Sequence, residues 1–361
     1  MVSTGFTKRV SQDWLEIFMS LKKSTINDVA LEAGVSVTTV SLVLSGKGRI
    51  SSATTERVNQ AVQALGFVPN RSATMLRGGG SGVVGLIVRD LCHPFYAEMT
   101  AGLSEGLEAQ GKVLFLTQSG PKGKQIDRCF DSLVAQGVEG IVLGGGAENA
   151  SHLVAKAREQ GIALICASRA SSLEETDSIR PDNLHAAQIA TEYLIRRGHH
   201  CIAWLGGSGS SLTRAERIGG YCSTLLQYGL PFRSEWIIES GRYQRDVAEL
   251  TEDLIHHHPT ITAILCHNAS VALGCYFGLQ RTGRTIGKGG VDSYYGQQMA
   301  LVGFGDAPEA ELTDPPLTFI TSSAREIGRT AAQRLLQRMA DPAGTVQNSI
   351  LPPVLIERGS A

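Results

Sequence analysis

The feature that most constrains the fold is an alternation of short apolar runs with amphipathic segments in the chain after Gly82. The apolar runs cover residues 83–88, 113–117, 138–143 and 163–166. Short continuous runs rich in Val, Ile and Leu are typical of strands that are buried on both faces of a sheet. Because helical patterns separate these runs, the sequence predicts parallel strands joined by crossover helices.

The alternation continues beyond the length of one ordinary domain. Further predicted strands cover residues 201–205, 263–266 and 300–302. Apolar residues at helical spacing predict the helices between the strands, and these cover 95–110, 125–136, 151–160, 184–197, 217–228 and 246–256. In a chain of 361 residues, the pattern predicts more than one domain, with parallel sheets covered by helices on both faces.

The N-terminal part of the chain has a different pattern, that of short helices with strong capping signals. Thr25 is a good N-cap, and Asp28 three residues later can complete a capping box. Gly34 is expected to end this helix in the left-handed conformation. Ser36 caps a second predicted helix, and a third covers residues 52–65. Two short helices joined by a glycine turn, with a third packed on them, form a helix-turn-helix domain.

The second of these helices carries side chains that suit DNA, which a generic three-helix bundle would not need. Its exposed face presents small polar and apolar groups that fit base edges, namely Val37, Thr38, Ser41 and Leu42. Donors that suit phosphate oxygens surround this face, namely Thr25, Ser36, Thr39, Ser45, Lys47, Arg49, Ser51 and Thr54. These side chains favour an α-helical DNA-binding head.

The distribution of charge agrees with a DNA-binding head. Residues 1–80 contain nine Lys and Arg and five Asp and Glu, a net charge of +4. The other 281 residues contain 24 basic and 29 acidic side chains, a net charge of −5. A basic head on an acidic body indicates a nucleic-acid-binding module joined to a second function.

The residues of the head support a specific resemblance. The first helix reads Thr25-Ile-Asn-Asp-Val-Ala, and the turn and second helix read Ala33-Gly-Val-Ser-Val-Thr-Thr-Val-Ser-Leu-Val-Leu-Ser-Gly46. These runs, with Leu65-Gly-Phe-Val-Pro-Asn-Arg71, resemble the LacI/GalR family of bacterial repressors. The run Ser41-Leu-Val-Leu-Ser-Gly-Lys-Gly-Arg-Ile-Ser51 resembles, more narrowly, regulators of maltose-system genes. The resemblance implies a homodimer that binds a palindromic operator in double-stranded DNA and represses carbohydrate genes.

Leu42 departs from the pattern of that family. The family usually has an Arg here, and in many members that Arg reads a guanine. The resemblance therefore does not imply a contact between this position and a guanine. A leucine suits the methyl group of a thymine instead.

Residues 70–81 are expected to form a hinge between head and body. Glycines at its end predict a flexible linker, and the possible helix over 72–77 is too short to be stable alone in water. The resemblance implies that this helix folds only on the operator, paired with its twin, with Asn70 and Arg71 at the DNA. Leu76 would then be the apolar wedge that opens a minor-groove step; the alternative is a plain linker leucine.

The body resembles the same family, for example at His93-Pro-Phe-Tyr-Ala-Glu98, Arg217-Ile-Gly-Gly-Tyr221 and Val302-Gly-Phe304. The resemblance implies a periplasmic-binding-protein-like body, residues 82–361, made of two parallel-sheet lobes. A small-molecule cleft between lobes, at the ends of strands, is also what such folds favour. The chain is expected to cross between the lobes near 180–184 and 308–320.

Carried over position by position, the resemblance gives Arg217 and Asn268 contacts with an effector such as a sugar or sugar phosphate. Arginine suits a carboxylate, a phosphate or a vicinal diol, and asparagine both donates and accepts. Phe95 and Tyr96 would supply an aromatic wall. The alternative role of Arg217 is a structural salt bridge between the lobes.

The effector set departs from the family at two positions. Ser168 precedes Arg169 where many members have an Asp before the Arg, and Gly305 precedes Asp306 where many have a second Asp. Two carboxylates that commonly bind ligand hydroxyls are therefore missing. An altered, weakened or unused effector site is expected.

Other kinds of function find less support in the sequence. The glycine-rich stretches at 144–146 and 206–209 match neither the dinucleotide-binding nor the P-loop motif, and a nucleophile elbow is missing. The seven cysteines contain no C-x-x-C pair, so zinc binding is not expected. We expect no enzyme, no metal site and no cofactor.

Residues 1–22 are expected to be an extension that is disordered or lies before the true start, for which Met19 is a candidate. The stretch has no apolar core followed by a small-residue cleavage site, so it does not resemble a signal peptide. We expect a cytoplasmic bacterial DNA-binding protein with no membrane contact, with its helix-turn-helix domain at residues 23–69. The alternative is a solute-binding protein that senses a small sugar without DNA.

Overall fold

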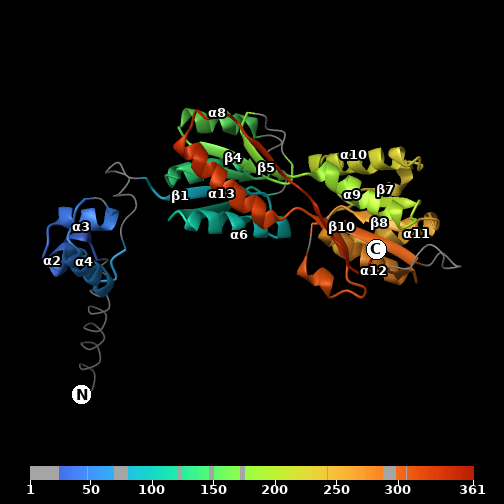
Figure 1. Ribbon diagram of the computed structural model, residues 1–361, viewed down its shortest axis with the longest axis horizontal. Helices are drawn as coiled ribbons and strands as arrows, with labels where there is room; N and C mark the ends of the chain where they lie inside the picture. The colour runs from blue at the N-terminus through green and yellow to red at the C-terminus, as the bar shows by residue number, and fades with distance from the viewer. Residues whose placement is uncertain are drawn as a thin grey trace, which may run out of the picture. The chain divides into compact units, whose positions relative to one another are not determined.

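The computed structural model describes residues 24–46, 48–68, 80–120, 123–145, 150–170, 175–241, 243–287, 298–305 and 307–361. The chain divides into two compact units, Met1–Ser81 and Gly82–Ala361 (Figure 1). The predicted extension 1–22 and most of the predicted hinge lie outside the described residues. The same is true of five residues discussed above, namely Lys47, Asn70, Arg71, Leu76 and Asp306.

The head contains helices α2 (Ile26–Ala33), α3 (Val37–Ser45) and α4 (Ser52–Ala64). The predicted capping box is confirmed, because Thr25 N donates to Asp28 Oδ2 at 2.7 Å and the Thr25 side chain accepts from Asp28 N. Gly34 ends α2 with a φ of 62°, which is the left-handed conformation that favours glycine. Apolar side chains from the three helices form the core of the head, namely Val29, Ala30, Ala33, Val40, Val58 and Ala61.

The first lobe of the body is a parallel sheet with the strand order β12-β5-β4-β3-β1-β2. Its strands are β1 (Val83–Val88), β2 (Val113–Gln118), β3 (Gly140–Gly144), β4 (Ala163–Ala167), β5 (Asp177–Pro181) and β12 (Asn348–Leu351). The predicted crossover helices are present as α6 (Pro94–Glu108), α7 (Ile126–Ala135) and α8 (Ser151–Glu159), and a late helix joins them as α13 (Ala324–Ala340).

The two faces of this sheet are covered by different pairs of helices. Side chains of α6 and α13 share a core with one face, whereas side chains of α7 and α8 share a core with the other. Adjacent residues of β1 alternate between these cores, as Leu86 and Ile87 do. In Figure 1, α8 and α6 lie on opposite sides of the strands.

The second lobe has the strand order β13-β11-β10-β8-β6-β7, with β9 paired to β10. Its strands are β6 (Ile202–Leu205), β7 (Ile237–Ile238), β8 (Ala263–Cys266), β9 (Thr285–Ile286), β10 (Gln298–Phe304), β11 (Thr318–Thr321) and β13 (Val354–Ile356). Its helices are α9 (Asn183–Arg196), α10 (Leu212–Gln227), α11 (Gln244–His257) and α12 (Ala269–Arg281). Helices α9 and α10 cover one face, and α11 and α12 cover the other.

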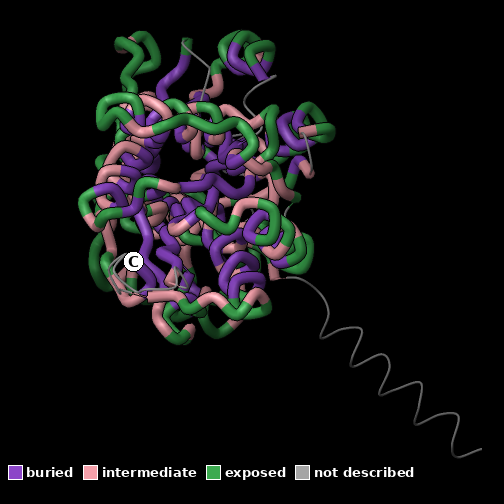
Figure 2. The backbone as a smooth tube through the Cα atoms, turned by 90° about the vertical axis from the view of Figure 1, so that its right-hand side faces the viewer, coloured by how far each residue is buried: buried purple, intermediate pink, exposed green. Residues whose placement is uncertain are grey.

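The central strands β1, β3, β6 and β8 are buried along their whole length, as their continuous apolar runs predict. In Figure 2 the buried segments, in purple, run through the interior, whereas exposed segments, in green, lie at the periphery. Strand β2 is different, because it lies at the edge of its sheet and several of its residues are exposed. The strand β13 pairs with β11 in the antiparallel direction.

Within the described residues the chain crosses between the lobes three times, from β5 to α9, from β11 to α13 and from β12 to β13. The crossing predicted near 180–184 is confirmed. The crossing predicted near 308–320 is wrong by a few residues, because β11 completes its pairing with β10 before the chain leaves the lobe. The third crossing, at 351–354, was not predicted.

Among the described residues, no single helix is both long and apolar enough to cross a membrane. The pair α2 and α3 reaches that length and apolarity only when the two helices are taken together, and their axes are bent by 103°.

Candidate DNA-contact surface and ligand cavity

Helix α3 presents the side chains that were expected to meet base edges. Of these four, Thr38 is exposed, whereas Val37, Ser41 and Leu42 are half-buried. Val37 packs against the core of the head, so part of its surface is used inside the domain. The four side chains therefore lie along one helix with Thr38 the most exposed of them, and their contact with DNA stays a prediction.

Several of the predicted phosphate donors also cap helices. Ser36 Oγ accepts from Thr39 N at 3.1 Å and lies 2.8 Å from Thr39 Oγ1. Ser51 Oγ likewise accepts from Thr54 N at 3.3 Å and lies 2.9 Å from Thr54 Oγ1. Such hydroxyls hold the first turns of α3 and α4, whose free backbone N–H groups suit phosphate oxygens. Arg49 lies exposed between the two helices.

Leu42 lies against the turn that follows α3. A Cβ atom on Gly48 would lie 3.5 Å from Leu42 Cδ2, an ordinary van der Waals distance. Ser45 Oγ donates to Leu42 O at 3.2 Å. The leucine is thus a short apolar group that leans on the end of its own helix, whereas an Arg at this position would extend further.

The body contains a cavity of about 470 Å³, which is within the range of small-molecule sites. Both lobes contribute to its walls, and many of the lining residues follow strands or begin helices. Its polar and charged lining includes Asp90, His93, Glu98, Arg169, Asn183, Arg217, Asn268, Ser270, Thr321, Ser322, Ser323 and Arg325, and its aromatic lining includes Phe95, Tyr243 and Phe304.

The cavity brings together some of the predicted effector residues. Phe95, Arg217 and Asn268 line it. Tyr96 and Ser168 are buried outside the lining, and Asp306 lies outside the described residues. Of the two aromatic residues predicted to form a wall of the cavity, Phe95 therefore lines the cavity and Tyr96 does not.

Tyr96 and Ser168 are buried next to residues that line the cavity and do not line it themselves. The Tyr96 ring packs in the core of the first lobe, and the Arg169 guanidinium lies 5.9 Å from its centre. Ser168 Oγ donates to Ala170 O at 2.6 Å. Both contacts hold the segment after β4 that carries Arg169, so these residues position a cation of the cavity.

Arg217 is buried, with 8% of its surface exposed. Its Nε donates to Asn183 Oδ1 at 3.0 Å and its Nη1 donates to His267 O at 2.6 Å. The Phe304 ring lies 4.6 Å from the guanidinium carbon. These partners are neutral and belong to the second lobe. Among the described residues, then, the arginine forms no salt bridge between lobes.

Burial lowers the pKa of Arg217 to about 9, and the nearby Arg169 contributes to the shift while Glu216 opposes it. Asn183 links the two arginines, because its Oδ1 accepts from Arg217 while its Nδ2 donates to Arg169 O at 2.6 Å. The same Nδ2 also donates to Glu216 Oε2 at 2.7 Å. Glu216 in turn pairs with Arg180 at 3.2 Å.

His93 caps the N-terminus of α6, where its Nδ1 accepts from Phe95 N at 3.2 Å. Its Nε2 lies 3.2 Å from Arg169 Nη1. Burial, with the charges of Arg169 and Arg217, lowers the pKa of His93 to about 3. The imidazole is therefore neutral at physiological pH.

Asn268 caps α12, and its Oδ1 accepts from Val271 N at 2.9 Å. Its carbonyl-type oxygen is thus used inside the protein. The amide nitrogen of the same side chain is the part that suits a ligand acceptor. The residue begins a helix at the cavity wall, as the strand-end pattern of the sequence predicts.

The sequence did not identify His93, Arg169 or Asn183 as members of the site. His93 and Asn183 were quoted only as parts of matching runs, and Arg169 only as the neighbour of Ser168. Their positions in the sequence could have identified them, because each residue lies just after a strand or at the start of a helix. In parallel sheets these positions lie at the carboxyl ends of the strands, where ligands bind. Their mutual contacts depend on the three-dimensional arrangement of β1, β4 and α9.

Comparison with known proteins covers both units of the chain. The model described as "Bacterial regulatory proteins, lacI family" matches residues 25–70. The model described as "Periplasmic binding proteins and sugar binding domain of LacI family" matches residues 81–356. The chain is 55% identical to the maltose regulon regulatory protein MalI of Escherichia coli (strain K12) over 335 residues, which cover 93% of this chain and 98% of the relative.

Two solved structures show the same fold over 94% of this chain. The lac repressor dimer bound to operator and the anti-inducer ONPF matches with a TM-score of 0.82 and 25% identity, over 99% of that chain. The complex of the transcriptional regulator CelR with cellobiose matches with a TM-score of 0.68 and 26% identity, over 100% of that chain.

Proposed function

This chain belongs to the LacI family of bacterial regulatory proteins, and we propose that it represses transcription of carbohydrate genes of the maltose type. The main observation in favour is the combination, in one chain, of a helix-turn-helix head and a two-lobed body with a cavity. The relative with 55% identity is a maltose regulon regulatory protein, which supports the choice of genes.

In this proposal α3 enters the major groove of the operator. Thr38, Ser41 and Leu42 contact base edges, with a smaller contribution from Val37. The residues proposed to contact the DNA backbone are Thr25, Ser36, Thr39, Ser45, Arg49, Ser51 and Thr54. Exposure of Thr38 and Ser45 and the free N–H groups of the helix starts support this assignment.

A dimer places two heads on the two half-sites of a palindromic operator. We propose that residues 70–81 act as the hinge, with Asn70 and Arg71 at the DNA and Leu76 as the wedge in the minor groove. The functional boundaries are then an extension at 1–22, the head at 23–69, this hinge and the body at 82–361. The lac repressor relative is a dimer on its operator, which supports the stoichiometry.

The cavity is proposed to bind a small-molecule effector, a sugar or a sugar phosphate. Phe95, Arg217 and Asn268 would contact it directly, while Tyr96 and Ser168 would hold the wall and Asp306 would add a carboxylate. The cellobiose complex of CelR supports a carbohydrate in this region. The chain is proposed to be a cytoplasmic regulator and not an enzyme.

A gel-shift experiment tests the central proposal. Full-length protein and DNA from upstream of its own and neighbouring genes are combined, with random DNA of equal length as the control. We expect one upstream fragment to be bound at a salt concentration where random DNA is free, because non-specific binding rests on phosphate charge and is weakened by salt. Equal binding of both DNAs, with sugar binding intact, would favour the solute-binding alternative.

Sedimentation of the same protein tests the assembly. We expect a mass near two chains of 38.5 kDa each. A stable mass near four chains, or a monomer that still binds the full palindrome, would contradict the proposed dimer.

A further inference from the structure

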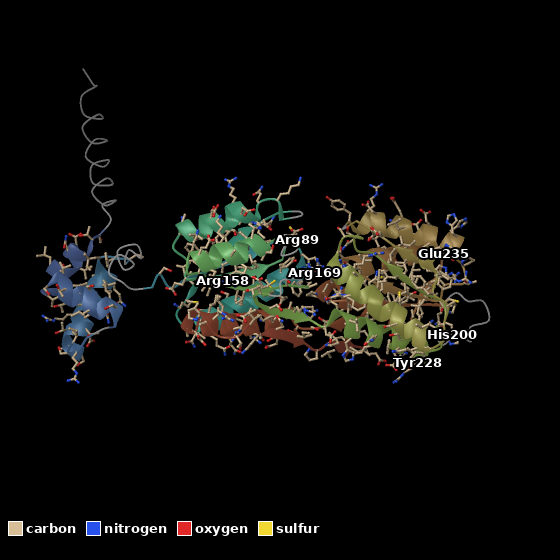
Figure 3. The ribbon with its side chains drawn as sticks, turned by 90° about the horizontal axis from the view of Figure 1, so that it is seen from above. Arg89, Arg158, Arg169, His200, Tyr228 and Glu235 are labelled. Atoms are coloured by element: carbon tan, nitrogen blue, oxygen red, sulfur yellow. The ribbon has the colours of Figure 1, made fainter. Side chains whose placement is uncertain are left out.

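The ligand cavity has an electrostatic character that a neutral sugar would not require. Arg169, from the segment after β4, and Arg217, from α10, both line it. Asn183 bonds Arg217 Nε and the main-chain O of Arg169, and the charge of Arg169 contributes to the lowered pKa of Arg217, so the two cations interact across the junction of the lobes. Figure 3 shows Arg169 at this junction. Two adjacent cations repel each other, and this repulsion is stronger inside a protein than in water.

The nearest imidazole cannot relieve this repulsion. Because His93 Nδ1 accepts the hydrogen of Phe95 N, the neutral ring carries its own hydrogen on Nε2. That nitrogen faces Arg169 Nη1 at 3.2 Å. In this tautomer the N–H groups of His93 and Arg169 point at each other, and in the other tautomer those of His93 and Phe95 do so. An oxygen atom placed beside His93 and Arg169 would accept the hydrogen that lacks an acceptor.

A further donor of Arg169 also lacks an acceptor. Within the described part of the chain, its Nε is buried without a hydrogen-bond partner. A buried donor without a partner is destabilising, because it has lost its hydrogen bonds to water. An oxygen-rich ligand group would satisfy this donor and the facing pair on His93 and Arg169.

The helices around the cavity add to its positive potential. The first residues of α6, α9, α12 and α13 all belong to the lining. Each of these helices has at least 13 residues, and a helix N-terminus carries a partial positive charge that favours anions.

The carboxylates of the described lining are Asp90 and Glu98, and both have partners. Glu98 Oε2 accepts from Arg325 Nη1 at 3.2 Å, and Asp90 Oδ1 accepts from Cys92 N at 3.0 Å. The pair of Glu98 and Arg325 is close to neutral as a unit. Glu216, behind Asn183, also pairs with Arg180, so Asp90 and Glu216 together face three arginines, Arg169, Arg180 and Arg217.

We propose that the effector is an anionic carbohydrate whose oxyanion group is bound between Arg169, Arg217 and the Nε2–H of His93. This inference rests on the proposed role of the cavity as the effector site. Arginine binds oxyanions through two parallel hydrogen bonds, and charge-assisted bonds of this kind are stronger than those to a hydroxyl. The oxyanion would then be bound by one cation from each lobe.

Isothermal titration of the full-length protein tests this proposal with defined probes. The probes are glucose 6-phosphate, glucuronate, inorganic phosphate, glucose and maltose. We expect glucose 6-phosphate or glucuronate to bind at least tenfold more tightly than glucose, and the comparison of the two distinguishes a sugar phosphate from a sugar acid. We also expect binding of the anionic sugars to weaken as NaCl increases, because salt screens charge.

Two variants sharpen the test. Arg169→Gln should lower the affinity for the anionic sugar at least tenfold and leave operator binding without effector unchanged. Arg158→Gln is the matched control, because Arg158 is an exposed arginine on α8 outside this cavity. It removes the same charge and should change the affinity less than twofold.

Tighter binding of glucose or maltose than of either anionic sugar would overturn the proposal, and so would a failure of all anions to bind. An equal loss in both variants would also overturn it. Operator binding is measured separately by gel shift. A protein that binds operator but no anion keeps its proposed function and loses this inference, whereas a protein that binds the anion but no operator loses the proposed function.

Discussion

Gly328 of α13 lies directly against Gly102 of α6. A Cβ atom on Gly328 would lie 3.0 Å from the carbonyl carbon of Gly102 and 2.1 Å from Met99 O. The reverse holds as well, because a Cβ on Gly102 would lie 2.0 Å from Arg325 O. The two helices that cover one face of the first sheet therefore touch through their backbones.

Gly328→Ala is expected to destabilise the body, because the added methyl group has to displace backbone. Overpacking of this kind typically costs about 1–3 kcal/mol. Gly219→Ala is the matched control, since Gly219 lies in α10 and nothing lies within 4 Å of the added Cβ. At that exposed position of the helix, alanine should stabilise by up to about 1 kcal/mol. Urea unfolding followed by circular dichroism measures both, and equal midpoints would contradict the close contact.

Leu76→Ala is expected to weaken specific operator binding by a few kcal/mol and to reduce the DNA bend. The reason is that an apolar wedge opens the minor groove and the lost contacts depend on the kink. Non-specific binding rests on phosphate charge and should stay unchanged. Gel-shift affinity and bend angle check the result, and a variant that binds and bends operator like the parent would show that Leu76 is only part of a linker.

Arg217→Ala is expected to have the opposite effect, with operator binding intact and any effector response abolished. Its side chain lines the cavity and has no role in the head. Because the arginine also bonds Asn183 and His267 O, thermal unfolding of the variant is a necessary control. Operator affinity with and without the sugars is the measurement. A full effector response in a folded variant would remove Arg217 from the site.

Leu42→Arg is expected to move the base preference of the head toward guanine at one position in each half-site. A well-placed arginine–guanine pair discriminates by about 1–3 kcal/mol. Arg49→Ala is the contrasting change, because loss of a phosphate contact weakens all sequences alike and lowers the salt slope by about one. Binding to operators with each base in turn measures both effects. An unchanged preference in Leu42→Arg would mean that this position does not face bases.

The stability of the body is expected to fall as the pH is lowered from about 6.5 to 4. Burial lowers the pKa of His199 to about 4. The unfolded chain, with a histidine pKa near 6.5, therefore binds a proton in this window that the folded chain does not. The stability due to the neutral ring is present above pH 6.5 and is lost progressively below it, by about 2 kcal/mol at pH 5.

His199→Gln should flatten this part of the pH dependence, measured as urea midpoints at pH 7 and pH 5. His200→Gln is the control, because His200 is the exposed neighbour whose charge is only a minor cause of the His199 shift, and its loss should change the profile much less. Identical profiles for both variants would contradict the assignment to His199.

The local signals of the sequence predicted the head and most of the body well. Thr25 with Asp28, Ser36 and Ser51 cap the helices of the head, and such caps depend on residues only three positions apart. The buried runs of β1, β3 and β8 are continuous apolar segments, so their pattern is visible in one dimension. The helix caps and the buried strands depend on residues that are close together in the sequence, so they can be predicted without knowledge of the tertiary structure.

The features that the sequence did not reveal depend on distant partners. Helix α13 contains several arginines that pair with Glu105 and Asp177, which lie far away in the sequence. Because of these arginines the helix has a polar composition, and its buried apolar residues were not recognised as one face of a helix. The short strands β12 and β13 lie at sheet edges and take their direction from β5 and β11. The contact of His93 with Arg169 likewise joins residues 76 positions apart.

The three passages of the chain between the lobes also affect the order in which the protein can fold during synthesis. The first sheet lacks its edge strand and a covering helix until residue 351 has been made, and the second lacks β13 until residue 356. The helices of the head are complete by residue 64. On the ribosome, where N-terminal domains generally fold first, the head can therefore form early, whereas the two lobes of the body have all their described strands only after residues 351 and 356 have been made.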